Sequence, residues 1–272
     1  MIDKNPPTAA PPAISAADYV TSLARGLRVM RLFGAATPRL TVSEAARASG
    51  FSRAAVRRLL LTLVAEGYAV QERDSFTLRP LVMELGYAWL STLDLPELAH
   101  SYLADVSAML RENCSLGILD GDDVLYVARS TARRIVQSTQ VSVGTRLPAS
   151  VSSLGRVLLA HLPDAALAAA LSRSPPRRFT PATVVDTEEL CALLAQVRVQ
   201  GFALVDGEFE SGLISIAVPI RNAQGHVVAA INVGAPTSRA TRPEMLKRYL
   251  PAIRAAASNV EKSLALRGWR TS

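Results

Sequence analysis

Residues 40–68 read LTVSEAARASGFSRAAVRRLLLTLVAEGY, and this stretch predicts two short helices joined by a turn. Thr41 and Glu44 have the spacing of a capping box, in which each side chain bonds the other residue's backbone N–H group. Gly50 predicts the end of the first helix because glycine readily takes the left-handed conformation found there. Ser52 is the expected N-cap of the second helix.

The second helix has an apolar and a basic face. Its inward face is predicted to hold four aliphatic residues at helical spacing: Val56, Leu59, Leu60 and Leu63. Arg53, Arg57 and Arg58 fall largely on the other side. A compact helix–turn–helix with a basic, solvent-facing second helix suits the major groove of DNA. The alternative is an ordinary amphipathic pair whose arginines only solvate one face.

The flanking sequence favours the DNA interpretation. An upstream third helix is predicted, with an inward stripe of Val20, Leu23, Leu27, Met30 and Phe33. Downstream, residues 67–78 alternate in polarity around a polar turn, as in a β-hairpin. Three helices followed by a hairpin make a winged helix–turn–helix over residues 18–79. The predicted DNA-binding residues are Thr41, Ser52, Arg53, Ala54, Arg57, Arg58 and Arg73.

A length of 272 residues favours two domains. Charge is distributed unevenly between the two parts of the chain. Residues 1–80 carry 11 Lys/Arg and 6 Asp/Glu, whereas residues 81–272 carry 19 and 17. Such clustering of positive charge indicates a polyanionic partner, here double-stranded DNA. A membrane surface would attract the same charge, but no long basic amphipathic helix or lipidation motif supports a membrane partner.

The two cysteines, Cys114 and Cys191, lie far apart and form neither a disulfide framework nor a C-x-x-C motif. The sequence shows no secretory h-region and no run of about 18 apolar residues. The expected compartment is therefore a bacterial cytoplasm.

The rest of the chain divides by composition and periodicity. Residues 1–17 are rich in Pro and Ala and predict a disordered tail. Residues 80–95 predict a linker helix with Leu81, Leu85, Ala88 and Trp89 on one face. A second subunit is the natural partner for that face because two DNA half-sites require two DNA-binding domains. Pro96 is expected to end this helix or start the next.

Residues 96–267 predict an α+β module with an antiparallel sheet. Helix 97–113 is expected to bury Leu98, Tyr102, Val106, Met109 and Leu110. The expected strands are 115–119, 124–128, 134–143, 202–206, 213–221 and 227–234. The further expected helices are 152–162, 164–171, 187–200 and 242–266. Residues 144–149 and 173–181 are expected to be loops.

Several segments together resemble the IclR family of bacterial transcription regulators over nearly the whole chain. They are SLARGLRVM at 22–30, the stretch 40–68, LPASVSSLGRVLLA at 147–160, the D-x-E-x-E-x-G segment 206–212 and ISIAVPIRNAQGHVVAAINV at 214–233. Within the family the chain looks most like the PcaR/PobR/PcaU-type subgroup. RAAVRRLLLTL, CSLGILDGDDVLYVARS, RLPASVSSLGRVLLA and LISIAVPI carry that likeness.

The resemblance implies a winged helix–turn–helix, a linker helix and a C-terminal GAF-like effector domain. It also implies dimers or tetramers, control of aromatic-acid catabolism, and RNA polymerase as a partner if the protein activates. Effectors in that subgroup are aromatic or dicarboxylic acids such as 4-hydroxybenzoate, protocatechuate or β-ketoadipate. The subgroup often has Arg where this chain has Ile214.

An enzyme is the rival class, but the sequence offers no catalytic or metal-binding set and implies no cofactor. G-x-S-x-G is absent, and the three histidines do not sit at ligand spacing. Asp206, Glu208 and Glu210 alternate along a predicted extended stretch, where one face could bind a cation or a ligand hydroxyl. The alternative is a solvated strand that protects a sheet edge.

The effector site is expected around a helix that Ser152 and Ser153 open, because free N–H groups at a helix start favour a carboxylate. Simple N-capping would need only one of the two. One of Arg129, Arg133, Arg134 and Arg146 could pair with that carboxylate. Ser215 and Asn232 are polar residues in apolar strands. By resemblance these strands and the Asp206 and Leu154 regions line the pocket. The predicted site comprises Arg146, Ser152, Ser153, Leu154, Gly155, Asp206, Glu208, Ser215 and Asn232.

Two hypotheses follow. The first, which the sequence favours, is a DNA-binding regulator controlled by a small organic acid. The second is a small-molecule-binding enzyme or sensor module whose basic N-terminal domain serves another role.

Overall fold

The structure is a computed structural model that describes residue 15 and residues 17–34, 36–90, 94–132 and 141–266. It divides into two compact units, of which one ends at Thr92 and the other begins at Leu93. In the described ranges no helix is long and apolar enough to cross a membrane.

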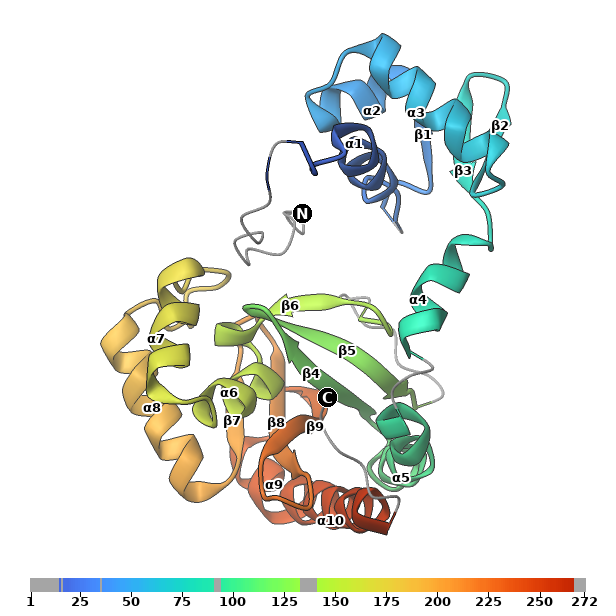
Figure 1. The fold of residues 1–272 in the computed structure, drawn as a ribbon. Coiled ribbons are helices and arrows are strands. Elements are labelled where there is room, and N and C mark those ends of the chain that lie inside the picture. Colours follow the sequence, from blue (N-terminus) through green and yellow to red (C-terminus); the bar gives the residue numbers. More distant parts are fainter. Residues whose placement is uncertain (1–14, 16, 35, 91–93, 133–140, 267–272) are drawn as a thin grey trace. The chain divides into compact units, whose positions relative to one another are not determined.

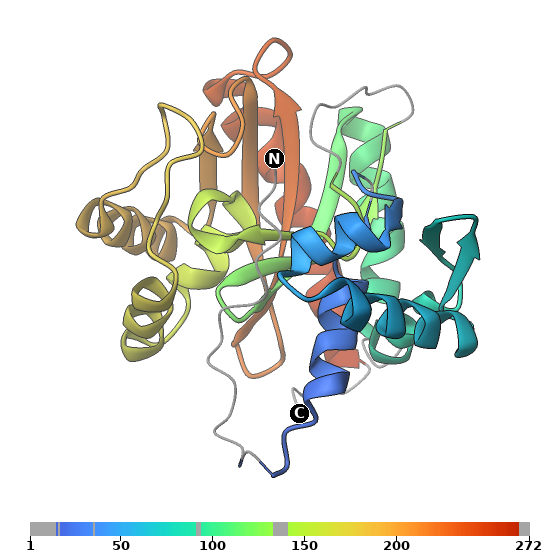
Figure 2. The ribbon, with the colours of Figure 1, turned by 90° about the horizontal axis from the view of Figure 1, so that it is seen from above.

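The N-terminal unit has three helices, a small sheet and a further helix. Its helices are α1 (Thr21–Met30), α2 (Val42–Ser49), α3 (Arg53–Ala65) and α4 (Val82–Leu90). Its strands are β1 (Arg39–Thr41), β2 (Ala69–Glu72) and β3 (Ser75–Leu78), paired antiparallel in the order β1-β3-β2. The hairpin β2–β3 follows α3 at one end of the helix cluster (Figures 1 and 2). The predicted winged helix–turn–helix is confirmed, and β1 is an addition too short for a sequence pattern to reveal.

The inward stripe predicted for α1 is wrong for Val20, Leu23 and Leu27, whereas Met30 and Phe33 are half-buried and pack against the core of this unit. Leu23 is 61% exposed, and Val20 and Leu27 are exposed as well. The helix instead buries Val29 completely, and Gly26 lies close to Leu59 of α3. A glycine permits a close helix contact, so α1 docks through its Gly26–Val29 side and leaves Val20, Leu23 and Leu27 exposed.

The C-terminal unit is built on a six-stranded sheet in the order β6-β5-β4-β9-β8-β7, in which every pair of neighbours is antiparallel. Its strands are β4 (Asn113–Asp120), β5 (Asp123–Ser130), β6 (Arg146–Pro148), β7 (Ala203–Asp206), β8 (Leu213–Arg221) and β9 (Val227–Pro236). The predicted fold class, an α+β protein with an antiparallel C-terminal sheet, is confirmed.

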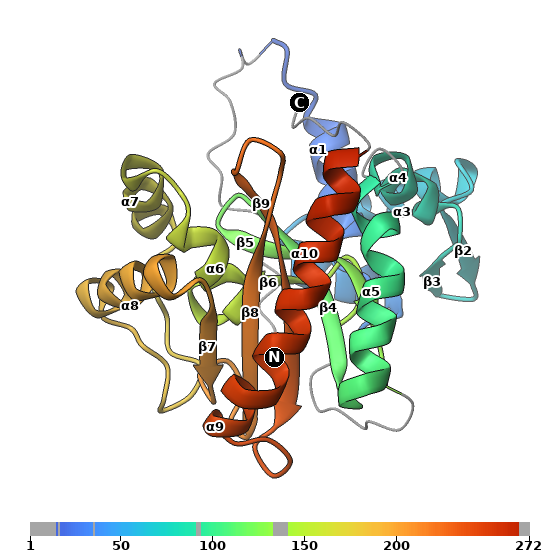
Figure 3. The same cartoon turned by 90° about the horizontal axis from the view of Figure 1, so that it is seen from below.

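Helices cover both faces of this sheet. The helices of this unit are α5 (Asp94–Leu110), α6 (Ser153–Ala160), α7 (Asp164–Arg173), α8 (Thr187–Gln200), α9 (Arg242–Glu244) and α10 (Leu250–Leu266), with a 3-10 turn at Ala149–Val151 and a π-helical turn at Met245–Tyr249. Helices α5 and α10 lie side by side on one face (Figure 3). Helix α6 packs on the other face and contacts α8.

Three expectations for this unit need correction. The strand predicted at 134–143 lies mostly outside the described residues, and residues 141–143 form no strand. The predicted loop 144–149 contains strand β6, whose pairing with β5 could not be read from three residues. Met109 is 65% exposed rather than inward, because α5 buries the stripe Leu95, Ala99, Leu103, Val106 and Leu110.

Candidate nucleic-acid interface and ligand cavity

Helix α3 presents a basic surface at its N-terminal end. Arg53, Ala54, Arg57 and Arg58 are all exposed. The opposite side of the helix buries Val56, Leu60 and Leu63 in the core of the N-terminal unit. Apolar packing therefore fixes which way the helix faces, and the arginines are free to contact a partner. An exposed arginine row at the start of a recognition helix can hold phosphates and read guanine edges.

Thr41 and Ser52 begin the two helices of the motif, and both side chains are engaged as caps. Glu44 N–H donates to Thr41 Oγ1 at 3.3 Å, and Thr41 N–H donates to the Glu44 carboxylate at 2.8 Å. The Thr41 hydroxyl also donates to this carboxylate at 2.9 Å, and the two hydrogen bonds from the Thr41 backbone and hydroxyl lower the pKa of Glu44. Ser52 Oγ accepts from Ala55 N–H at 3.3 Å. The primary role of both hydroxyls is to position α2 and α3.

Arg73 lies at the turn of the hairpin β2–β3. Its φ of 56° lies in the left-handed region, where residues other than glycine are uncommon. Gln71 Nε2 donates to the Arg73 carbonyl oxygen at 2.9 Å and supports this turn. The Arg73 side chain is exposed. It therefore carries positive charge at the tip of the wing.

Two arginines that the sequence did not single out join this basic surface. The guanidinium groups of Arg25 and Arg28 on α1 each lie 5.4 Å from the centroid of the Phe51 ring, in the turn between α2 and α3. Cation–π contacts of this kind hold the guanidinium groups near the ring. The many arginines between residues 25 and 58 indicated a basic surface. No sequence spacing, however, predicts that the arginines of α1 contact Phe51.

A cavity of about 300 Å³ opens in the C-terminal unit. It is bounded by the sheet, by the start of α6 and by the segment between β7 and β8. Its polar lining residues are Asn113, Ser115, Tyr126, Arg129, Ser152, Ser153, Glu208, Glu210, Ser211, Ser215 and Asn232. Apolar residues such as Val141, Leu147, Val151, Val205, Phe209 and Leu213 complete it. An apolar wall with a few polar groups is the usual form of a small-molecule site.

Five of the nine predicted effector residues line this cavity: Ser152, Ser153, Glu208, Ser215 and Asn232. Ser152 also caps α6 by accepting from Gly155 N–H at 3.0 Å. Asn232 Nδ2 donates to Ser153 Oγ at 3.4 Å and links the sheet to α6. The structure thus brings together residues that are up to 80 positions apart.

The other four do not line the cavity. Arg146 is paired with Asp120 and Asp123 on the hairpin β4–β5. Leu154 is completely buried in the apolar core. Gly155 packs so tightly on the 3-10 turn that a Cβ there would lie 2.1 Å from the carbonyl oxygen of Ala149. Asp206 is exposed at the end of β7.

The predicted alternation of Asp206, Glu208 and Glu210 along one extended strand is wrong. Strand β7 ends at Asp206, and the chain bends at Gly207, whose φ is 69°. As a result Asp206 is exposed whereas Glu208 is buried. The period-two pattern gave no warning of this bend. Ile214 is buried on β8 and is not a lining residue of the cavity.

Arg129 supplies positive charge to the cavity. It lies in register with Ser115, which in turn lies in register with Asn232, so three adjacent strands contribute one polar row. Arg129 Nη1 donates to Ser115 Oγ at 3.0 Å. Burial lowers the pKa of Arg129 and raises that of the neighbouring Tyr126 to about 12. At neutral pH this leaves a cationic guanidinium beside a neutral phenol.

Of the four arginines considered from the sequence, Arg129 is the one that the described cavity contains. Arg133 and Arg134 lie outside the described residues. Sequence reasoning did not place Asn113, Tyr126, Phe209 or Gly234 in the site. The alternation of Asn113 with Ser115, and of Asn232 with Gly234, could have indicated the two strand positions.

Two family models match this chain. The model described as IclR helix-turn-helix domain matches residues 22–73, and the model described as bacterial transcriptional regulator IclR C-terminal matches residues 87–262. Together they cover the N-terminal helix–turn–helix and most of the unit that holds the cavity.

Curated relatives and a solved structure agree with these matches. The chain is 43% identical over 243 residues to the Pca regulon regulatory protein of Pseudomonas putida, covering 89% of this chain and 84% of that protein. It is 34% identical to the p-hydroxybenzoate hydroxylase transcriptional activator of Acinetobacter baylyi, covering 89% and 91%. It also resembles the crystal structure of an IclR homologue from Microbacterium hydrocarbonoxydans complexed with 4-hydroxybenzoate. That likeness has a TM-score of 0.79 at 30% identity and covers 92% of this chain and 100% of the other.

Proposed function

The chain belongs to the IclR family of bacterial transcriptional regulators, and from that premise we propose that an aromatic carboxylic acid bound in the C-terminal cavity controls its affinity for operator DNA. We infer that the genes under its control encode aromatic-acid catabolism, and that it acts in the cytoplasm, where its DNA lies. The observation that carries the proposal is a partly apolar cavity with Arg129 in its wall. No observation favours the alternative of an enzyme.

The DNA half of the proposal rests on the exposed arginines of α3. Arg53, Arg57 and Arg58 would enter the major groove, while Arg73 on the wing would contact the flanking backbone. The N-caps of α2 and α3 are Thr41 and Ser52, and Ala54 lies in the first turn of α3. The positive end of a helix dipole favours a phosphate there.

The effector half rests on the charge and shape of the cavity. A ligand carboxylate would pair with Arg129, and the start of α6 at Ser153 would add the positive end of its dipole. The ring would pack on apolar residues such as Val205 and Phe209, and hydroxyl substituents would bond to Ser215 or Asn232. The bound 4-hydroxybenzoate in the Microbacterium homologue supports an aromatic acid of this kind.

We also propose that the protein acts as a dimer or as a pair of dimers. The exposed apolar stripe on α1 and the exposed Met83, Leu85 and Tyr87 on α4 are surfaces that a second copy would cover. Two recognition helices on a pseudo-palindromic operator require two such units. If the regulator activates transcription, RNA polymerase is a further partner. Sedimentation that shows a monomer at micromolar concentration, with and without DNA, would contradict this assembly.

A ligand screen combined with a DNA-binding assay tests the function. The full chain is heated with a panel of aromatic and dicarboxylic acids, and binding is read as a rise in Tm. We expect an aromatic acid to stabilise the protein and to change its affinity for DNA from upstream of its own gene. If no acid raises Tm, or if the protein binds that DNA no better than unrelated DNA of equal length, the proposal is contradicted.

A further inference from the structure

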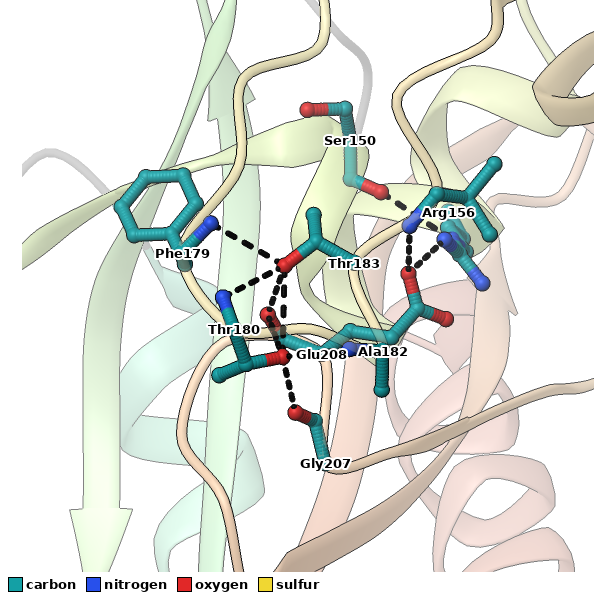
Figure 4. Close-up of polar contacts among 9 residues, drawn as sticks. Ser150, Arg156, Phe179, Thr180, Ala182, Thr183, Gly207 and Glu208 are labelled. Carbon is teal, nitrogen blue, oxygen red and sulfur yellow. Dashed lines mark hydrogen bonds and ion pairs between the residues drawn. The ribbon is translucent and has the colours of Figure 1, made fainter.

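Residues 177–184, called here the bracing segment, run between α7 and α8, and Thr180 and Thr183 of this segment bond Gly207 and Glu208 just after β7 (Figure 4). Thr180 Oγ1 donates to the Gly207 carbonyl oxygen at 2.6 Å. Thr183 Oγ1 donates to the Glu208 carbonyl oxygen, also at 2.6 Å. Both threonines are buried. The bend that carries the chain from β7 into the cavity wall is therefore held by two threonine side chains.

The same wall is fixed by a buried ion pair. Arg156 Nη2 lies 2.6 Å from Glu208 Oε2, and the two side chains are only 4% and 9% exposed. Val184 N–H donates to the same carboxylate oxygen at 3.1 Å, and Arg156 Nε donates to the Ser150 carbonyl oxygen at 3.0 Å. One carboxylate thus joins α6, the bracing segment and the β7–β8 segment.

An aromatic contact extends this support to the residue after Glu208. The ring of Phe209 lines the cavity, and its centroid lies 5.3 Å from that of Phe179. The Arg177 guanidinium lies 4.8 Å from the Phe179 centroid. Phe179, Thr180 and Thr183 are not cavity-lining residues, so they act on the cavity only through Gly207, Glu208 and Phe209.

We propose that the bracing segment is a positioning element of effector recognition, which holds Phe209 and Glu208 in place so that the cavity selects an aromatic acid. This inference rests on the proposed function of the cavity. Its consequence is that residues without ligand contact set both the affinity and the selectivity of the site. A wall that is held on three sides loses little conformational freedom when a ring packs on it, whereas a loosened wall must be ordered at the expense of affinity.

Two variants loosen the wall in different ways. Thr180→Val removes the hydroxyl that bonds Gly207 while keeping the shape of the side chain. Phe179→Leu removes the ring that packs on Phe209 while keeping the backbone hydrogen bonds of the segment. In each we expect 4-hydroxybenzoate to bind at least about threefold and up to about tenfold more weakly, the equivalent of one net hydrogen bond. Thr180→Ser, which keeps the hydroxyl, should restore most of the affinity.

Matched controls separate positioning from general destabilisation. Ile253→Val creates a small void under α10, on the other face of the sheet, and should lower Tm without affecting the ligand. Thr187→Val changes an exposed threonine beyond the bracing segment. A second titration with adipate, an aliphatic dicarboxylate, tests selectivity. The ratio of adipate to 4-hydroxybenzoate Kd should fall in the bracing variants and stay constant in the controls.

The experiment is isothermal titration of each full-length variant, with Tm recorded in parallel. The inference is supported if the bracing variants weaken 4-hydroxybenzoate binding and alter selectivity while Ile253→Val, at a similar loss of Tm, does neither. It is overturned if the bracing variants bind as the parent does, or if Ile253→Val weakens binding equally. If Arg129→Gln loses binding while the bracing variants bind as the parent does, the proposed function is supported and the inference about the bracing segment is overturned. Failure of the parent to bind any aromatic acid would contradict both.

Discussion

Helix α3 turns its arginines to solvent, whereas the cavity of the C-terminal unit holds Arg129 within a wall made by several strands and α6. Arg53, Arg57 and Arg58 lie on one helix, and the structure records no hydrogen bond or ion pair of their side chains within the described chain. In the cavity, Arg129 of β5 donates to Ser115 of β4, and Asn232 of β9 donates to Ser153 of α6. A substitution on the exposed surface of α3 should therefore change DNA binding alone. A substitution in the cavity should change both ligand binding and the stability of the C-terminal unit.

The largest expected effect is on DNA binding. Replacing Arg53 and Arg57 by Ala should weaken operator binding by about 1–3 kcal/mol for each residue that reads a base, which amounts to about 2–6 kcal/mol if both do. Tm and effector affinity should not change, because both side chains are exposed and lie in the other unit. Fluorescence anisotropy with labelled operator at fixed salt measures the loss. Unchanged operator affinity in the double variant would remove α3 from the interface.

The next largest effect concerns the buried ion pair. Arg156→Leu leaves the Glu208 carboxylate buried without its partner, which should destabilise the C-terminal unit by about 3–5 kcal/mol. Denaturant unfolding, followed by probes in each unit, should show this loss in the C-terminal transition alone. The double variant Arg156→Leu, Glu208→Leu should recover much of it. A single variant as stable as the parent would show that the pair does not hold the wall.

Arg129 and Arg146 offer a matched pair of variants within the same unit. Arg129→Gln should weaken effector binding by about 1.5–3 kcal/mol, the range for a hydrogen bond to a charged group. Arg146→Gln should leave it unchanged, because Arg146 is paired with aspartates outside the cavity. Both are titrated with the acid identified in the screen. Equal losses would contradict the proposal that Arg129, and not Arg146, pairs with the ligand carboxylate.

The smallest effect is on the N-cap of α2. Thr41→Ala should cost about 0.5–2 kcal/mol of stability in the N-terminal unit. The pKa of Glu44 is lowered in the folded protein by its hydrogen bonds from Thr41, so its contribution is present above the unfolded pKa and is lost as pH falls through the folded one. Unfolding of the parent and Thr41→Ala across this pH range should show a weaker pH dependence in the variant. An unaltered pH profile would contradict the capping-box account.

The sequence predicted more of the N-terminal unit than of the C-terminal cavity. In the helix–turn–helix, caps such as Thr41 and Ser52 and the helical spacing of Val56 and Leu60 are local signals, and each was confirmed. The exception is α1, where Leu23 is exposed. Periodicity identifies an apolar stripe but not what covers it.

In the C-terminal unit, the serine at a helix start and the polar residue in an apolar strand that the sequence singled out, Ser153 and Asn232, do line the cavity. Arg146 does not line the cavity, and its pairing with the β4–β5 turn depends on a strand register that three residues could not specify. The bend at Gly207 and the contact between Phe179 and Phe209 depend on tertiary packing across 30 residues. No local pattern encodes such contacts.

The central claim is that effector and operator binding are coupled. Isothermal titration of the effector into the free protein and into the protein saturated with operator DNA tests it most directly. Since coupling between two sites is reciprocal, the effector Kd should differ between the two titrations by about 5- to 150-fold. The operator Kd should change by the same factor when the effector is present. An effector Kd that is identical in both titrations would contradict the account.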